Sequence, residues 1–421
     1  MVRTGDRALM RELNAGLVVD AIRRQEPISR AAVADVTGLS RATVTAITAV
    51  LLDQGWIREV GTGESLRGRR PVLLQLERGA RFCLGVKIAP DTVSAAVGDL
   101  RADLSVPVTR AVQALDSAEV LAAVQECCAR ALEAAGVDRA QVIGVGAVLP
   151  GVVDPQAGIA VAAPSISWSN VPLRWLMQEK LQLPVFLEND ANAFALAECH
   201  YGAGRGRRHV LGVTLGVGIG AGIVLDGRIY RGAHSGAGEL GHMNVLPGGP
   251  QCSCGRRGCL EAVAADAAIA GSAREEVRRG GMRRVLEIAG GEPTGINREA
   301  VVDAARAGDG EAVAVLRQSG EHIGRALANV VNLLNPATIV IGGELVQQAG
   351  ELILGPVREA VYRGSFAVLG NDLEVAPTAL GEQSWLKGAV SIVLQEVFRL
   401  PVSPHADHSS ISLVSGLGGA R

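Results

Sequence analysis

The stretch Gly238-Glu239-Leu240-Gly241-His242 is followed, after nine residues, by Cys252-Ser253-Cys254-Gly255-Arg256-Arg257-Gly258-Cys259-Leu260-Glu261. It places one histidine and three cysteines within eighteen positions, among glycines and prolines that favour a loop folded back on itself. Thiolates and a neutral imidazole suit Zn²⁺, whereas Mg²⁺ and Ca²⁺ prefer oxygen ligands. The spacing therefore predicts a closed structural zinc site with His242, Cys252, Cys254 and Cys259 as ligands. The alternative is four unconnected residues in a surface loop.

Two carboxylates flank this predicted zinc loop, residues 242–259. Glu239 lies three residues before the histidine, and Glu261 lies two residues after the last cysteine. A metal loop bracketed by carboxylates is suited to presenting hydrogen-bond acceptors to a ligand.

The combined pattern is Glu-Xaa-Gly-His followed by Cys-Xaa-Cys-Gly-Xaa-Xaa-Gly-Cys-Xaa-Glu. It closely resembles the signature of the ROK family, the repressors, open reading frames and sugar kinases. The resemblance implies an actin-like ATPase fold with two α/β lobes and a cleft between them. Because the family contains both sugar-sensing transcription factors and sugar kinases, the rest of the chain has to decide between them.

Composition limits the possible functions. At 421 residues the chain should hold two or three domains, and a net charge of −2 means that any nucleic-acid contact must be local. We expect a cytoplasmic protein without membrane insertion, because the N-terminus lacks an apolar core and no run approaches the roughly 20 apolar residues of a membrane-spanning helix. The remaining cysteines, which we expect to be buried thiols of a reducing compartment, are Cys83, Cys127, Cys128 and Cys199.

The N-terminal region predicts a winged helix-turn-helix. Apolar residues at four-residue spacing from Leu9 to Ala21 indicate a first helix that Pro27 ends. Ser29 can cap a second helix, Gly38 makes the turn, and Ser40 caps a third helix. The apolar face of that third helix is Val44, Ile47 and Leu51, and two strands beginning near Ile57 and Pro71 form the wing.

Two groups of residues in this region are candidates for DNA contact. On the third helix they are Ser40, Arg41, Thr43 and Thr45, with Thr48 also assigned to the polar face. In the wing they are Arg67, Arg69 and Arg70, in a narrow Arg-Gly-Arg-Arg-Pro segment suited to a minor groove. The alternatives are a solvated helix face in a protein-binding module and a solvated charge cluster or linker.

From Arg81 onward, strands alternate with helices, which indicates a layered α/β fold. A hairpin is expected over residues 81–97, a helix over 118–135 and a buried strand over 142–148. A second such set has a hairpin over 209–225, a helix over 321–334 and a strand over 338–341. We expect a DNA-binding domain at residues 1–78, a ROK sugar-sensing domain at 79–400 and a flexible tail at 401–421.

The pair Asn189-Asp190 follows a short strand, at a strand end where ligands gather in open α/β sheets. For Asn189, a helix-capping role is an alternative reading. In ROK kinases the residue matching Asp190 is the general base and the one matching Asn189 holds the sugar. The resemblance also implies sugar contacts for Glu239, Glu261 and His242, and it makes zinc a structural clamp of the pocket.

The sequence departs from the family kinases at the first phosphate loop. The kinases carry Asp-Xaa-Gly-Gly-Thr there, whereas this chain has Lys87-Ile88-Ala89-Pro90-Asp91-Thr92. Two glycines and the aspartate are missing, and Pro90 has no N–H to offer a phosphate. Because phosphoryl transfer depends on positioning the phosphates, we expect no kinase activity and only a vestigial role for Asp190.

These observations predict a sugar-responsive transcriptional regulator, most simply a repressor released from operator DNA by a sugar or sugar phosphate. It should act as a homodimer or homotetramer, because one reading head covers only a half-site. One alternative is an ATP-dependent, glucokinase-like sugar kinase that retains a DNA-binding head. Another is an interaction protein controlled by docking to a sugar-transport component.

Overall fold

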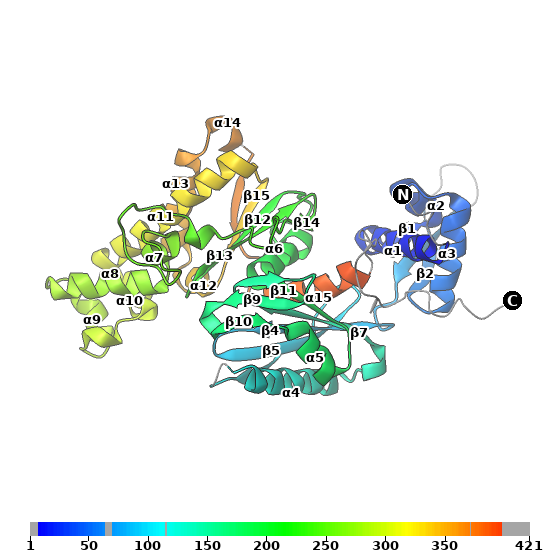
Figure 1. The fold of residues 1–421 in the computed structure, drawn as a ribbon. Helices are drawn as coiled ribbons and strands as arrows, with labels where there is room; N and C mark the ends of the chain where they lie inside the picture. Colours follow the sequence, from blue (N-terminus) through cyan, green and yellow to red (C-terminus); the bar gives the residue numbers. More distant parts are fainter. Residues whose placement is uncertain (1–6, 64–69, 114–115, 371, 398–421) are drawn as a thin grey trace. The chain divides into compact units, whose positions relative to one another are not determined.

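The computed structural model describes residues 7–63, 70–113, 116–370 and 372–397 (Figure 1). The chain divides into two compact units. Unit 1 consists of Met1–Asn189 and Ala389–Arg421, and unit 2 of Asp190–Gly388. The predicted tail, residues 401–421, lies outside the described residues. Each of two large buried apolar clusters belongs to one unit, so each unit has a core of its own.

The N-terminal part of unit 1 contains helices α1 (Arg7–Gln25), α2 (Arg30–Thr37) and α3 (Arg41–Asp53) and strands β1 (Ile28–Ser29), β2 (Ile57–Thr62) and β3 (Val72–Leu76) (Figure 1). The Ser29 hydroxyl accepts from the N–H of Ala32, and the Ser40 hydroxyl accepts from the N–H of Thr43, as the predicted caps require. Gly38 ends α2 with φ of 71°. The predicted helices and wing strands are confirmed. Strand β1, which adds an edge to give the order β1-β3-β2, is too short to show alternation in the sequence.

The buried face of α3 differs from the prediction at one residue. Val44, Ile47 and Leu51 are buried as expected, but Thr48 is also fully buried. Its hydroxyl accepts a hydrogen bond from Nε of Arg30 at 3.1 Å. Assigning Thr48 to the DNA-facing side is therefore wrong, because helical periodicity places it on the face that carries Val44 and Leu51.

The α/β part of unit 1 is a five-stranded sheet of order β11-β7-β4-β5-β6. Its strands are β4 (Phe82–Ile88), β5 (Thr92–Asp99), β6 (Val108–Ala111), β7 (Val142–Leu149) and β11 (Val185–Asn189). Strands β4, β5 and β6 form an antiparallel meander, and β7 and β11 run parallel to β4. Every residue of β7 is buried, as expected for a strand covered on both faces.

Helices cover both faces of this sheet. Helix α4 (Ser117–Ala135) packs against the apolar residues of β5. The opposite face carries glycines, and helix α15 (Gln383–Val397) lies close against them. A Cβ on Gly146 would lie 2.0 Å from the carbonyl oxygen of Ala389, and one on Gly98 would lie 2.7 Å from Val390 Cγ2. Helix α15 begins in unit 2 and continues into unit 1 from Ala389.

Unit 1 also contains a smaller sheet of order β10-β9-β8. The remaining elements are η1 (Arg139–Gln141), β8 (Val152–Asp154), β9 (Ile159–Ala163), η2 (Pro164–Ile166), β10 (Trp168–Val171) and α5 (Leu173–Leu181). Leu173, Met177 and Leu181 of α5 are buried in the core of unit 1.

Unit 2 repeats the topology of the large sheet of unit 1. Its strands are β12 (Val210–Leu215), β13 (Ile219–Leu225), β14 (Arg228–Ile229), β15 (Thr338–Gly342) and β16 (Glu374–Pro377), in the order β14-β13-β12-β15-β16. In both units an antiparallel meander of three strands is followed by two strands parallel to the first. Helix α6 (Asp190–Tyr201) packs on β12 and β13. The predicted two-lobed α/β fold is confirmed.

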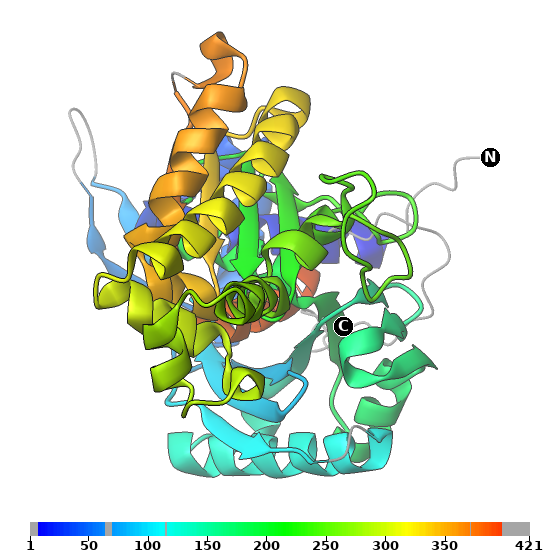
Figure 2. The ribbon, with the colours of Figure 1, turned by 90° about the vertical axis from the view of Figure 1, so that its left-hand side faces the viewer.

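Most helices of unit 2 come between β14 and β15 in the sequence. They are η3 (Leu240–His242), α7 (Leu260–Ala264), α8 (Asp266–Arg278), α9 (Arg283–Ile288), η4 (Pro293–Gly295), α10 (Arg298–Arg306) and α11 (Gly310–Leu334), with α12 (Glu344–Ala349), α13 (Glu351–Gly364) and α14 (Ala367–Gly370) after β15. Helices α11 and α13 run side by side (Figure 2). Helix α11 begins well before its predicted start at Glu321, because the Asp309 carboxylate accepts from the N–H groups of Glu311 and Ala312.

The four cysteines outside the predicted zinc loop are buried, as expected for thiols that act as small apolar residues. Burial raises the pKa of the Cys128 thiol to about 12. Among the described residues, no single helix has both the length and the apolar composition to cross a membrane. Helices α2 and α3 meet this criterion of length and composition only when they are counted as one segment, and that segment is bent by 119° between them.

Candidate functional site

The predicted zinc loop is held in a fixed shape by its own backbone. His242 ends η3, and Cys259 immediately precedes α7. The Cys252 N–H donates to the carbonyl of Arg256 at 2.8 Å, and the Gly255 N–H donates to the carbonyl of Cys252 at 2.9 Å. These bonds curl the segment between the cysteines into a tight turn, so that the cysteines face the histidine.

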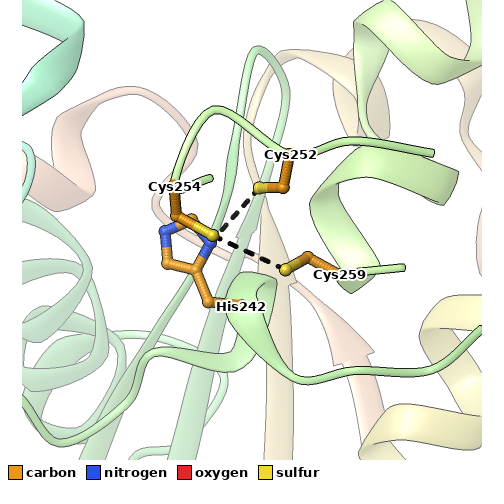
Figure 3. A group of neighbouring side chains, drawn as sticks. All are labelled: His242, Cys252, Cys254 and Cys259. Carbon is orange, nitrogen blue, oxygen red and sulfur yellow. Dashed lines mark hydrogen bonds between the residues drawn. The ribbon is translucent and has the colours of Figure 1, made fainter. Parts of the chain in front are cut away.

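The four predicted ligands come together around one point (Figure 3). Their candidate ligand atoms all lie within 4.8 Å of one another. The Cys254 and Cys259 Sγ atoms are 3.7 Å apart, and Cys252 Sγ is 3.6 Å from His242 Nδ1. Zinc bonds of about 2.3 Å to sulfur and about 2.0 Å to nitrogen place tetrahedral ligands roughly 3.5–3.8 Å apart. The cluster therefore fits a tetrahedral metal ion in both ligand chemistry and spacing.

Arg256 is a component of this cluster that the sequence pattern did not single out. Its backbone N–H and its guanidinium hydrogen-bond to Cys254 and lower the pKa of that thiol to about 6. The guanidinium also donates to the carbonyl oxygen of His242 at 3.0 Å. An arginine thus stabilises the thiolate that a metal would require. Its position between Cys254 and Cys259 was the available signal in the sequence.

A close backbone approach inside the loop requires glycine at position 258. Gly258 has φ of +75°, and a Cβ there would lie 1.8 Å from the carbonyl oxygen of Leu246. Its N–H donates to the carbonyl of Pro250 at 2.8 Å. Only a residue without a side chain lets the two limbs of the loop pass this closely before Cys259.

The predicted sugar-binding carboxylates gather beside this cluster. His242 Nδ1 faces Cys252, while its Nε2 lies 3.9 Å from Glu239 Oε2. Burial raises the pKa of the Glu239 carboxyl, Glu261 and Asp190 raise it further, and His242 opposes the shift. Three carboxylates and an imidazole edge therefore share one region of unit 2, although Asp190 is far from the others in sequence.

Glu261 is held by two hydrogen bonds. Its Oε2 accepts from the backbone N–H of Ile219 at 3.2 Å, and its Oε1 accepts from the Ser253 hydroxyl at 3.4 Å. A Cβ on Gly218 would lie 2.7 Å from Glu261 Oε2. The carboxylate therefore joins the zinc loop to the glycine turn between β12 and β13.

The pair Asn189-Asp190 lies where the chain passes from unit 1 to unit 2. Asn189 ends β11, and its side-chain amide donates to the carbonyl of Gly151 at 2.9 Å. Asp190 begins α6, and its carboxylate accepts from the N–H of Ala191 at 2.8 Å. Asn189 thus belongs to unit 1, while the predicted sugar residues Asp190, Glu239, His242 and Glu261 belong to unit 2.

The first hairpin of the α/β fold ends in a tight turn. The Ala89 N–H donates to the carbonyl of Thr92 at 2.8 Å, which closes the turn around an exposed Pro90 and Asp91. In unit 2 the turn between β12 and β13 contains Gly216 and Gly218 and exposes Val217.

In the N-terminal head, several predicted DNA contacts lie on the surface. Arg41, Thr45 and Arg70 are exposed, whereas Thr43 is half-buried. The Ser40 and Thr43 hydroxyls lie 2.8 Å apart at the start of α3, and the Thr45 hydroxyl donates to the carbonyl of Arg41. Arg67 and Arg69 lie outside the described residues. Of the predicted DNA contacts that the structure describes, Arg41 and Arg70 carry exposed charges.

Comparison with known proteins agrees with this geometry. Residues 83–396 match the ROK family. The chain is 29% identical to a xylose repressor of Caldicellulosiruptor bescii, over 94% of this chain and 99% of the repressor.

Two solved structures are similar. A ROK family transcriptional regulator, a homologue of the E. coli MLC protein, has a TM-score of 0.80 at 32% identity, covering 92% of this chain and 96% of its own. A ROK family glucokinase from Streptomyces griseus, in complex with glucose and AMPPNP, has a TM-score of 0.67 at 31% identity, covering 74% of this chain and 98% of its own. The chain belongs to the ROK family.

Proposed function

We propose that this protein is a sugar-responsive DNA-binding transcriptional regulator, acting as a repressor that a bound sugar or sugar phosphate releases from its operator. The observation that supports this proposal most strongly is the share of the chain that each relative matches. The xylose repressor matches over 94% of the chain, whereas the glucokinase covers 74% of it. A match over 94% of the chain is too long to leave out the N-terminal head, whereas the ROK family match begins at residue 83, and this supports a DNA-binding role for the head.

The proposed sugar site consists of Asn189, Asp190, Glu239, His242 and Glu261. Carboxylates accept hydrogen bonds from sugar hydroxyls, and charged acceptors make stronger bonds than neutral ones. The Glu261 and Asp190 carboxylates both disfavour the charged form of Glu239, so a ligand rich in hydroxyl donors would relieve this repulsion. A polyhydroxylated ligand suits this group better than an apolar one.

The metal that fits the cluster is zinc, held by His242, Cys252, Cys254 and Cys259. The ion would have a structural role, because four protein ligands leave no open position for a substrate. Nδ1 of His242 faces the cysteines, so a metal there would orient the Nε2 edge toward Glu239. The loop would then determine the shape of the sugar site.

Sugar phosphorylation is the weaker candidate activity. The turn at Ala89 to Thr92 is closed by its own backbone hydrogen bond, and Pro90 lacks an N–H. A phosphate brought to this turn would find few free donors, and phosphoryl transfer depends on such donors. Asp190 keeps the position of the kinase base without a matching phosphate cradle.

On DNA, the head would place the start of α3 in the major groove, with Ser40, Arg41, Thr43 and Thr45 near the bases and Arg67, Arg69 and Arg70 in the wing. One head reads only a half-site, so we propose that the regulator binds its operator as a homodimer or homotetramer. The buried thiols and a DNA target fit a cytoplasmic protein. Docking to a sugar-transport protein is an additional form of control compatible with this arrangement.

The deciding experiment is a gel-shift titration of operator DNA against hexoses, pentoses, amino sugars and their phosphates. At least one sugar should weaken DNA binding by about 5- to 150-fold, the usual range of allosteric coupling. No effect from any of them would contradict the inducer mechanism. A coupled ATP assay with the same sugars tests the kinase alternative. A turnover of about 1 to 100 per second would favour the kinase instead.

A further inference from the structure

A short segment, residues 77–81, connects the DNA-binding head to the large sheet of unit 1. On the head side, the Glu77 N–H donates to the carbonyl of Trp56 at 2.9 Å, and the Arg81 guanidinium lies 5.5 Å from the centre of the Trp56 ring. On the sheet side, the Gln141 amide donates to the carbonyl of Gly79 at 3.4 Å. The connecting segment is therefore attached to both parts and does not behave as a free linker.

An ion pair between Glu26 and Arg101 also connects the head to the sheet. Glu26 lies just after α1 in the head, and its Oε2 accepts from the Leu76 N–H at 2.6 Å. Its Oε1 pairs with Arg101 Nε. The side chains of Glu26 and Arg101 are only 8% and 22% exposed. Such a sheltered pair is screened less by salt than an exposed one, so it can hold the head in a defined orientation.

Arg101 is rigidly attached to the sheet. The Asp99 carboxylate accepts from the N–H groups of Arg101 and Asp103, at 2.8 Å and 2.9 Å, which closes the turn after β5. Leu100 and Ala102, on either side of Arg101, are fully buried. The guanidinium therefore moves with the end of β5.

The same end of the sheet contacts the helix that both units share. Gly98 packs against Val390 of α15, three residues before Arg101. Helix α15 starts in unit 2 at Gln383. A change in how unit 2 holds the start of α15 would therefore act on β5 beside Gly98, and through the Asp99 turn on Arg101.

We propose that the Glu26–Arg101 pair is the contact through which sugar occupancy controls the orientation of the DNA-binding head. This inference rests on the proposed function and names its regulatory element. The two residues act as positioning residues: they are not expected to touch sugar or DNA. Without the pair, the head should still bind DNA but should respond little to sugar.

The test is a double-mutant cycle in the full-length protein with Glu26→Gln, Arg101→Gln and the double variant. Operator affinity is measured without sugar and with the saturating sugar that raises the Tm most, and the ratio of the two Kd values is the sugar response. We expect this ratio to fall in each variant to within about twofold of 1. The double variant should lose no more than either single variant, because both changes break one contact.

The cycle includes its own controls. In Glu26→Gln, the glutamine side chain keeps an acceptor for the Leu76 N–H. If Glu26→Gln nevertheless destabilises the head, Arg101→Gln still provides the test, because it leaves the hydrogen bond between Glu26 and Leu76 intact. Arg130→Gln, which breaks the exposed pair of Arg130 with Glu126 in α4, should keep the wild-type response. The sugar-induced rise in Tm should persist in all variants.

The possible results are distinguishable. A wild-type sugar response in the Glu26 and Arg101 variants would overturn this inference alone. Loss of the sugar-induced Tm rise in those variants would also overturn it, because the effect would then lie in sugar binding. A wild-type protein that binds DNA without any sugar response would contradict the proposed function as well.

Discussion

The Glu261 carboxylate accepts a hydrogen bond from the backbone N–H of Ile219 at 3.2 Å, although the two residues are 42 positions apart. Its other oxygen accepts from the Ser253 hydroxyl. One side chain thus connects the cysteine-rich loop to the turn between β12 and β13. Any ligand that competes for this carboxylate would act on both segments together.

Replacing Glu261 with Ala should weaken sugar binding strongly. A hydrogen bond to a charged group is worth about 1.5–3 kcal/mol, so the affinity should fall about 10- to 150-fold. The measurement is sugar affinity by calorimetry or Tm shift. Ser253→Ala is the matched control, because it removes the 3.4 Å hydrogen bond to Glu261 and a 3.9 Å contact with Cys252 Sγ but leaves the Glu261 carboxylate in place, and it should change affinity little. Equal effects of the two variants would argue against a sugar contact for Glu261.

Replacing Cys259 with Ser should release the metal. Metal analysis of the purified protein should show one zinc per chain in the wild type and a large loss in the variant, because one of four ligands is gone. Sugar response should be lost before operator binding, since loop and head belong to different units. Cys128→Ser, a buried thiol in α4, is the control and should retain zinc. Absence of zinc from the native protein would refute the metal assignment.

Replacing Arg41 with Ala should weaken operator binding. Arg41 is exposed at the start of α3, and loss of one base or phosphate contact costs about 1–3 kcal/mol, or roughly 5- to 150-fold in affinity. The sugar-induced Tm rise should be unchanged. Arg130→Ala, on an exposed face of α4, removes the same charge elsewhere and should leave the operator Kd unaltered. Equal operator affinities for the two variants would place Arg41 outside the DNA interface.

Stability should depend on pH through Asp266. Burial raises the pKa of this carboxyl to about 6, and its pair with Arg298, at 2.7 Å, offsets the rise only in part. Because the folded-state pKa lies above the unfolded value, the folded state binds the extra proton, and stability falls as pH rises from about 4 through about 6. Partial exposure limits the effect to at most about 2 kcal/mol.

The measurement for Asp266 is urea unfolding of the wild type and Asp266→Asn across this pH range. The variant cannot titrate at this position, so the difference in unfolding free energy between the two proteins isolates the carboxyl. The unfolding free energy of the wild type should decrease relative to that of Asp266→Asn as pH rises. A difference that stays constant with pH would show that the carboxyl keeps an ordinary pKa.

Local features of this protein could be predicted because their causes are local. The four predicted metal ligands lie within eighteen positions, so their chemistry and spacing were sufficient to predict the cluster. The caps at Ser29 and Ser40 depend on neighbouring N–H groups, and both are confirmed. Buried strands such as β7 followed from a continuous apolar run. The two-lobed fold was predicted from the resemblance of the cysteine pattern to the ROK family signature.

The sequence by itself therefore determined the cluster of one histidine and three cysteines, the helix caps and the alternation of strands and helices, because each depends on residues close in the chain. Only the tertiary structure decided that Thr48 faces Arg30, that Glu261 reaches Ile219 and that Glu26 pairs with Arg101. These partners are separated by many residues, and a side chain that satisfies a distant group leaves no periodic or spacing signal. The physical reason is that such contacts arise from packing of whole elements, which brings polar groups together only after the core has formed.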